Sequence, residues 1–115
     1  MSDALIKNLE GLLAKGGDSA VLRLALSSRY LDAGDAVTAA SHAEAAVRLD
    51  PEYSAAWKAL GRALAAAERD DEASRAYLRG MEMAERRGDV QAVKEMRVFL
   101  KRLGMRAPKP PAADS

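Results

Sequence analysis

The chain has 115 residues, which suits one small domain. About half of the residues are apolar but only 4% are aromatic, so a core must be built largely from alanine and leucine. Charged residues make up 30% of the chain and nearly balance, at a net charge of +1, which argues against a general nucleic-acid binder.

The chain contains no cysteine and one histidine, His42. This composition excludes disulfides, thiolate metal sites and a zinc site built from several histidines. The N-terminal segment carries Asp3, Lys7 and Glu10, which do not fit a secretory signal. No apolar run approaches the roughly 20 residues that a membrane-spanning helix needs. We therefore expect a soluble, cytoplasmic protein with no cofactor, no bound metal and no membrane span.

Apolar residues recur at helical spacing along most of the chain, and no segment alternates with a period of two. In chain order, the predicted helices cover residues 3–15, 19–33, 35–49, 53–68, 70–87 and 89–103. Glycines are expected to end several of them, because glycine accepts the left-handed backbone of a C-terminal cap. These glycines are Gly16, Gly17, Gly34, Gly88 and Gly104.

Residues suited to N-terminal capping precede three of these helices. They are Asp18 or Ser19, then Asp35, and finally Asp89, while the fifth helix is expected to begin at Asp70 or Asp71. The last residues, 105–115, hold three of the four prolines and little apolar surface, so this tail is predicted to be disordered. The helical domain is expected to end at residue 104.

An internal repeat underlies this pattern. Residues 20–53 can be laid over residues 54–87, an offset of 34 positions. The matched pairs include Ala25 with Ala59, Leu26 with Leu60, Ser27 with Gly61, Tyr30 with Leu64 and Ala39 with Ala73. Self-similarity at such a fixed period predicts a repeat architecture.

The second copy places Trp57, Leu60, Gly61 and Leu64 on one helix face, and Tyr77 follows on the next helix. Gly61 lacks bulk, so the two helices can approach closely while the Trp57 and Tyr77 side chains fill the spaces beside it. A ligand-stacking role for Trp57 is the alternative to this packing role.

These residues resemble the tetratricopeptide repeat family, whose pattern is Trp-x2-Leu-Gly-x2-Tyr, then Ala-x3-Phe, then Pro. The first copy departs from it at Arg23 and Ala43, where the family has Trp and Phe. Glu85 replaces the final Pro of the second copy, which predicts a longer fifth helix. A third copy loses the register at Lys94, which occupies the Leu position.

The resemblance implies an all-α fold of about six helices, in which antiparallel helix-turn-helix repeats stack as a short right-handed solenoid. It indicates a small two-repeat protein of bacterial type, with repeats at 20–53 and 54–87. Because two repeats bury little surface alone, the helices at 3–15 and 89–103 are expected to close the two ends.

In this family the first helices of successive repeats line a concave groove that holds a peptide or helix of another protein. Helical phase assigns twelve residues of this chain to that groove. They are Val21, Leu24, Ser28 and Leu31, then Ala55, Lys58, Arg62 and Ala65, then, in a less certain register, Asp89, Ala92, Met96 and Phe99.

The strongest candidate contact is the pair Lys58 and Arg62, which are four residues apart and point the same way. Beside Leu24, Ser28 and Leu31, these cations would hold an acidic group on an otherwise apolar peptide. The alternative is a solvated pair on an exposed face. A carboxylate clamp like that of the family's co-chaperones is incomplete here, so capture of a chaperone's acidic C-terminus is not expected.

Other polar residues have simpler interpretations. His42 is expected to be an exposed surface residue, and the acidic run from Asp70 to Glu72 to cap a helix rather than bind metal. Ser27 and Ser28 have no base nearby and so are not expected to act as nucleophiles.

The segment 89–103 and the tail carry an excess of basic residues opposite an apolar stripe. The basic residues are Lys94, Arg97, Lys101, Arg102, Arg106 and Lys109; the stripe is Val93, Met96, Phe99, Leu100 and Leu103. Such a helix either binds an anionic membrane or acidic partner, or packs its apolar stripe on the preceding helix pair. Packing is the preferred interpretation.

The sequence therefore predicts a non-catalytic adaptor or scaffold that binds another protein, as a monomer or weak homodimer. The alternatives are a self-associating structural module and a basic helix that binds an anionic surface. An enzyme is not indicated, because no nucleophile, base and orienting group occur together and no glycine-rich phosphate loop is present.

Overall fold

A computed structural model describes the backbone of residues 2–105 and the side chains from residue 4 onward. This part of the chain is entirely helical. The helices are α1 (Ser2–Ala14), α2 (Ala20–Asp32), α3 (Ala36–Leu49), α4 (Ser54–Ala66), α5 (Asp70–Arg87) and α6 (Val90–Gly104). The predicted all-α architecture of six helices is confirmed for these residues. The predicted disordered tail lies outside them, apart from Met105, which caps α6.

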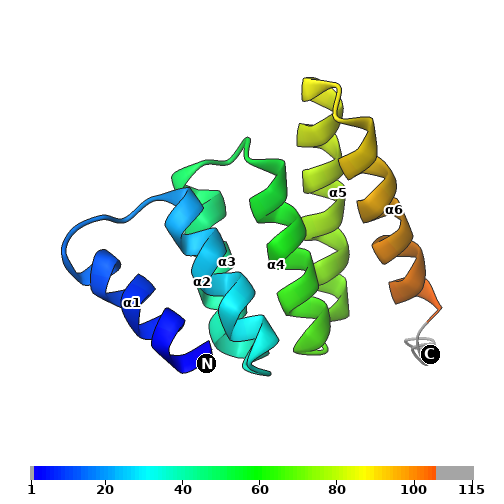
Figure 1. Cartoon of the computed structure of the whole chain (residues 1–115). Helices are drawn as coiled ribbons and strands as arrows, with labels where there is room; N and C mark the ends of the chain where they lie inside the picture. The colour runs from blue at the N-terminus through cyan, green and yellow to red at the C-terminus, as the bar shows by residue number, and fades with distance from the viewer. Residues whose placement is uncertain (1, 106–115) are drawn as a thin grey trace.

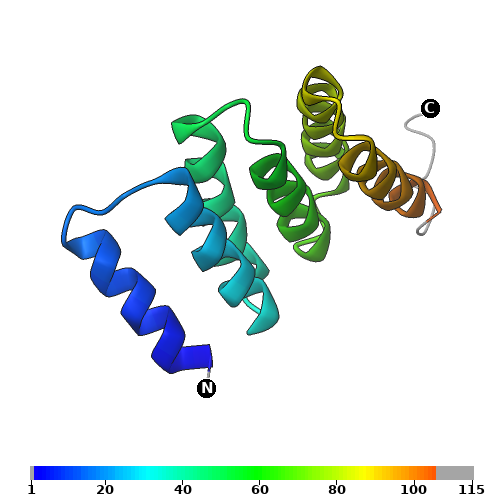
Figure 2. The same cartoon turned by 45° about the horizontal axis from the view of Figure 1, so that its top comes forward.

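The helices follow one another across the molecule, with α1 at one end and α6 at the other (Figure 1). α2 packs on α3 and α4 packs on α5, which makes two helical hairpins. α2 also contacts α4, and α4 contacts α6, so these three helices share one layer (Figure 2). Within the described residues, α1 packs on α2 alone, and α6 packs on α5 and α4.

Side-chain caps fix three helix starts at the predicted places. The Ser19 hydroxyl, the Asp35 carboxylate and the Asp89 carboxylate each accept a hydrogen bond from the backbone N–H three residues later, at 3.1, 3.1 and 3.0 Å. This bond satisfies an N–H group that has no partner inside the helix. Of the two candidates before α2, Ser19 is therefore the cap.

α5 begins at Asp70, as predicted, and its N-cap residue is Arg69 rather than a member of the acidic run. Arg69 makes no side-chain cap, while Asp70, Asp71 and Glu72 lie in the first turn. Negative charge there still favours the helix dipole. Arg69 instead forms an ion pair with Glu72, at 2.7 Å between Nη2 and Oε1.

α5 is longer than the other helices, at 18 residues, as the missing proline at Glu85 predicted. Because of this length, α6 starts two residues later than the 34-residue repeat would place it. Counted from the N-cap residues Ser19, Tyr53 and Asp89, the buried residues Leu26, Leu60 and Met96 all fall seven positions later. The 34-residue register therefore breaks at Lys94, as predicted, and Met96 takes the Leu position two residues later.

Small residues allow the helices of the second hairpin to approach closely. A Cβ atom added to Gly61 would lie only 2.4 Å from Cε1 of Tyr77, so the tyrosine ring occupies the space above the glycine. The Tyr77 side chain is 2% exposed, and its ring stacks on Phe99 of α6 at a centroid distance of 5.6 Å. One ring therefore connects α4, α5 and α6.

Gly80 serves the same purpose one turn after Tyr77, on the same face of α5. A Cβ atom there would lie 2.5 Å from the sulfur of Met96 and 2.9 Å from Cβ of Trp57. Trp57 thus packs on α5, as predicted, but its ring stays partly exposed. The indole N–H donates to the carbonyl of Pro51 at 2.7 Å, and Arg79 lies over the ring at 5.6 Å from its centroid.

We expect Gly61→Ala to lower the free energy of unfolding by about 1–3 kcal/mol, because the added methyl group overlaps the Tyr77 ring. Gly11→Ala in α1 is the matched control, since a Cβ atom added to Gly11 would meet nothing within 4 Å. Urea denaturation of both variants tests this. Equal effects of the two substitutions would contradict the close α4–α5 contact.

The turn between α4 and α5 contains the one non-glycine residue with a positive φ among the described residues, Glu68, at φ 63°. The equivalent residue in the turn between α2 and α3 is Gly34, at φ 86°. In both turns the next backbone N–H donates to a helix carbonyl, from Asp35 to Tyr30 at 2.9 Å and from Arg69 to Leu64 at 2.8 Å. The turn therefore requires the left-handed backbone that glycine adopts most readily.

Replacing Glu68 with glycine is expected to stabilise the protein by about 1 kcal/mol, since the left-handed strain exceeds the entropy that glycine adds to the unfolded chain. Glu68→Ala removes the same carboxylate but keeps a Cβ atom, so it should bring no comparable gain. Thermal melts distinguish the two. A gain with alanine as large as with glycine would show that charge, and not backbone strain, is the cause.

Candidate functional site

The layer formed by α2, α4 and α6 contains a cavity between α2 and α4. Its volume is about 280 Å³. The residues that line it are Leu24, Ser27, Ser28, Leu31, Ala55, Lys58, Ala59 and Arg62. We call it the α2–α4 groove. It brings together the five candidate contact residues of the sequence analysis, namely Leu24, Ser28, Leu31, Lys58 and Arg62.

Other residues assigned to the groove lie elsewhere. Val21 is 66% exposed and Ala65 is partly buried, and neither lines the cavity. Phe99 stacks on Tyr77 and packs against the core, so it does not line the cavity either. The assignment failed there because it assumed the 34-residue offset, whereas the longer α5 shifts α6 by two positions.

A second, smaller cavity of about 150 Å³ extends the groove between α4 and α6. Asp89, Ala92 and Met96 line it, as expected, together with Lys58, Gln91 and Glu95. Glu95 was not predicted to face the groove, since its position depends on the shifted register of α6. Two neighbouring hollows, which share Ala55 and Lys58 in their linings, therefore lie along the three helices of the layer.

The Lys58 side chain is held by a salt bridge across this groove. Its Nζ atom lies 2.8 Å from Oε1 of Glu95, and Gln91 donates to the other oxygen of that carboxylate at 3.4 Å. These hydrogen bonds, the one from Lys58 first, lower the pKa of Glu95 below its usual value. Lys58 therefore already has an anionic partner and is only about one-third exposed, at 32%.

Arg62 differs from Lys58 in this respect. Its side chain is exposed at the edge of the α2–α4 groove, and no salt bridge to it occurs within the described residues. Leu24 and Leu31 lie in the same cavity and are partly buried. The groove thus presents an apolar floor with one available guanidinium group, which can bind a carboxylate with two parallel hydrogen bonds.

Comparison with known proteins agrees with the observed hairpins. The family model described as tetratricopeptide repeat matches residues 30–96. The TPR repeat-containing protein PA0015 of Pseudomonas aeruginosa is 50% identical over 99 residues, which cover 86% of this chain and 94% of that protein. The solution structure of protein BPP2914 from Bordetella parapertussis has a TM-score of 0.75 and 40% identity, with 87% of each chain covered.

The chain belongs to the tetratricopeptide repeat family. Tetratricopeptide repeats are generally non-catalytic and mediate protein–protein interaction, which agrees with the broad function expected from the sequence. The repeat boundaries at 20–53 and 54–87, and the contact residues of the groove, remain predictions.

The apolar stripe of α6 packs inward in this tetratricopeptide repeat protein. Val93 and Met96 are buried, and Phe99, Leu100 and Leu103 pack against the core. These side chains are therefore not free to enter a lipid surface, so the packing interpretation of α6 is the correct one. Across residues 2–105, every helix is too short or too polar to cross a membrane.

Ser27, which was considered as a nucleophile, has a structural role. Its hydroxyl is buried and donates to the carbonyl of Ala39 in α3, at 2.8 Å. This bond fixes the spacing of the first tetratricopeptide hairpin at the position where Gly61 lies in the second.

The prediction that His42 is an exposed surface residue was wrong. It is partly buried in a polar cluster at the α1 end of the molecule. Its Nδ1 atom lies 3.1 Å from Nη1 of Arg23, and its ring stacks on Tyr30 at a centroid distance of 5.4 Å. Asp18 holds the Arg23 guanidinium through two contacts, at 2.8 and 3.2 Å. The Tyr30 hydroxyl donates to the Glu10 carboxylate, which links α1 to α2.

This cluster explains the departure of the chain from the family pattern at Arg23. Where the second repeat places Trp57 against α5, the first places an arginine that reaches His42 on α3. Because an arginine nitrogen can only donate, Nδ1 of His42 must accept and must therefore be unprotonated. Burial first, and the charge of Arg23 second, lower the pKa of His42 below its usual value.

The cluster predicts a pH-dependent stability. A folded state that holds the His42 pKa low resists protonation more than the unfolded chain does. The contribution of neutral His42 is thus complete above the unfolded pKa of about 6.5 and is lost progressively as the pH falls below it. Glu10 and Asp18 oppose this effect, and Arg23 reinforces it.

We therefore expect the wild-type protein to lose more stability between pH 7.5 and pH 5.5 than the His42→Gln variant. Urea denaturation at the two pH values measures the difference. An equal loss in both proteins would mean that His42 protonation is not linked to folding.

Proposed function

We propose that the protein is a non-catalytic adaptor that binds a short segment of another protein in the α2–α4 groove. In this proposal Leu24 and Leu31 contact an apolar side chain of the segment, and Arg62 holds an acidic group beside it. The observation that carries the proposal is that an exposed cation with no salt bridge in the described structure lies at the edge of an apolar cavity.

The size of the groove favours a side chain of a larger partner over a free small molecule. At about 280 Å³ it falls just below the range of about 300–1,000 Å³ typical of small-molecule sites. A cavity of this size has room for one or two side chains of a peptide or helix. The membership of the chain in a family of interaction repeats supports a protein partner.

The Lys58–Glu95 salt bridge also bears on the choice of partner. An anion that bound Lys58 would have to displace Glu95, whose carboxylate accepts from both Lys58 and Gln91. An anion at Arg62 displaces nothing that the structure describes. The acidic group of the partner is therefore assigned to Arg62, and Lys58 acts mainly by holding α4 and α6 together at the groove.

The test is affinity capture from a lysate of the source organism with wild-type protein and with Arg62→Glu. Proteins that bind through the groove should be depleted by about tenfold or more in the variant, because a charge-assisted hydrogen bond is replaced by repulsion. Their capture should also weaken at high salt.

Arg48→Glu is the matched control, since Arg48 is an exposed arginine near the end of α3 that does not line the groove. It should leave the captured proteins unchanged. If Arg62→Glu and wild-type protein capture the same set in the same amounts, the groove is not the binding site.

A further inference from the structure

α6 begins a helical hairpin that the described chain does not complete. In the first two hairpins, α3 covers α2 and α5 covers α4. α6 packs on α5 and α4, but no helix of residues 2–105 covers its other side. Figure 1 shows this side of α6 at the end of the molecule.

The register of the N-caps identifies the uncovered positions. Eight positions after Ser19, Tyr53 and Asp89 lie Ser27, Gly61 and Arg97. Ser27 contacts α3 through its hydroxyl, and Gly61 receives the Tyr77 ring of α5. At this position the second helix of each hairpin contacts the first directly. In α6 the same position carries a large cation instead of a small residue.

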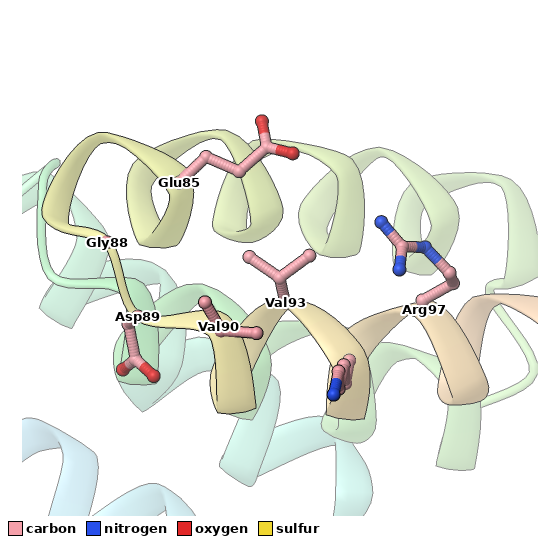
Figure 3. Close-up of a pocket in the computed structure, with 7 residues that line it drawn as sticks. Glu85, Gly88, Asp89, Val90, Val93 and Arg97 are labelled. Carbon is pink, nitrogen blue, oxygen red and sulfur yellow. The ribbon is translucent and has the colours of Figure 1, made fainter.

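A cavity lies beside this cation, between α6 and the end of α5. Its volume is about 260 Å³, and the residues that line it are Glu85, Gly88, Asp89, Val90, Val93, Lys94 and Arg97. Figure 3 shows Glu85 projecting from α5 and Arg97 from α6, with Val90 and Val93 between them. Val90 is 62% exposed. We call this surface the α6 open face.

The cavity of the α6 open face is lined by two acidic residues, Glu85 and Asp89, and by two basic ones, Lys94 and Arg97. The Asp89 carboxylate already caps α6, and Lys101 adds a further cation one turn beyond Arg97. Lys94, Arg97 and Lys101 follow one another at helical spacing, all three are exposed, and none forms an ion pair with any residue that the structure describes. Glu85 does not neutralise Arg97 by an ion pair either. A ligand that fits here must therefore bring apolar side chains for the cavity and negative charge for Arg97.

We propose that the α6 open face binds an α-helix of another protein, which completes the third hairpin and places an acidic side chain against Arg97. The covering helices α3 and α5 supply the geometry of such a complex. A lipid surface would need an exposed apolar stripe to insert, and the apolar stripe of α6 is already packed inward. This interaction uses none of the residues of the α2–α4 groove, so it stands or falls independently of it.

The test uses a probe that copies the packing of α5 on α4. It is a synthetic peptide with the sequence of Asp70–Arg87 and the change Tyr77→Glu, so that a carboxylate replaces the ring that meets Gly61. The control peptide carries Tyr77→Lys. Binding to the full-length protein is measured by fluorescence anisotropy, and its position by NMR shifts of the Val90 and Val93 methyl groups.

We expect the Glu peptide to bind about tenfold more tightly than the Lys peptide, and Arg97→Glu in the protein to reverse that preference. Arg48→Glu should leave it unchanged. Equal binding of both peptides, or no binding of either, would overturn the proposal.

Two further outcomes would assign the face to another ligand and equally overturn the proposal. One is a wild-type dimer in analytical ultracentrifugation that Arg97→Glu dissociates, which indicates a second copy. The other is binding of the wild-type protein to phosphatidylglycerol vesicles but not to phosphatidylcholine vesicles. In that outcome Arg97→Glu abolishes the vesicle binding, and the Glu peptide does not bind the protein.

Discussion

The contact between the Tyr77 ring and Gly61 sets the geometry on which the rest of the structure depends. With so few aromatic residues, the core consists mainly of alanines, which bury enough surface only when helices approach closely. The bare glycine allows that approach, and the ring then reaches Phe99 of α6. The separation of α4 from α5, and the seating of α6, both follow from one buried side chain.

The surfaces that can bind partners follow from this packing. Because α5 holds α4 and α6 together, Lys58 meets Glu95 across the layer and Arg62 is left as the available cation of the α2–α4 groove. At the end of the stack, the position equivalent to Gly61 is Arg97. The two hairpins carry small residues at this position, Ser27 and Gly61, whereas α6 carries a cation. The exposed face of α6 is therefore charged.

The sequence was sufficient for the helices and for most of the groove, because both follow from short-range signals: capping residues, glycines and the spacing of apolar positions. It failed in part at α6, where the groove assignment of Phe99 ignored the two-residue shift caused by the longer α5. It also missed the polar cluster of His42 and the role of Glu95. Those contacts join residues far apart in the chain, and helical phase within one repeat does not specify them.

The most direct test of the central contact is a double-mutant cycle between Gly61→Ala and Tyr77→Leu, measured by urea denaturation. If the ring sets the helix separation, alanine at position 61 is costly beside Tyr77 but much less so in the Tyr77→Leu background, where two of the three overlapping atoms, Cε1 and Cζ, are gone. An equal cost of Gly61→Ala in both backgrounds would contradict the account, because Gly61 would then be required for some reason other than the tyrosine ring.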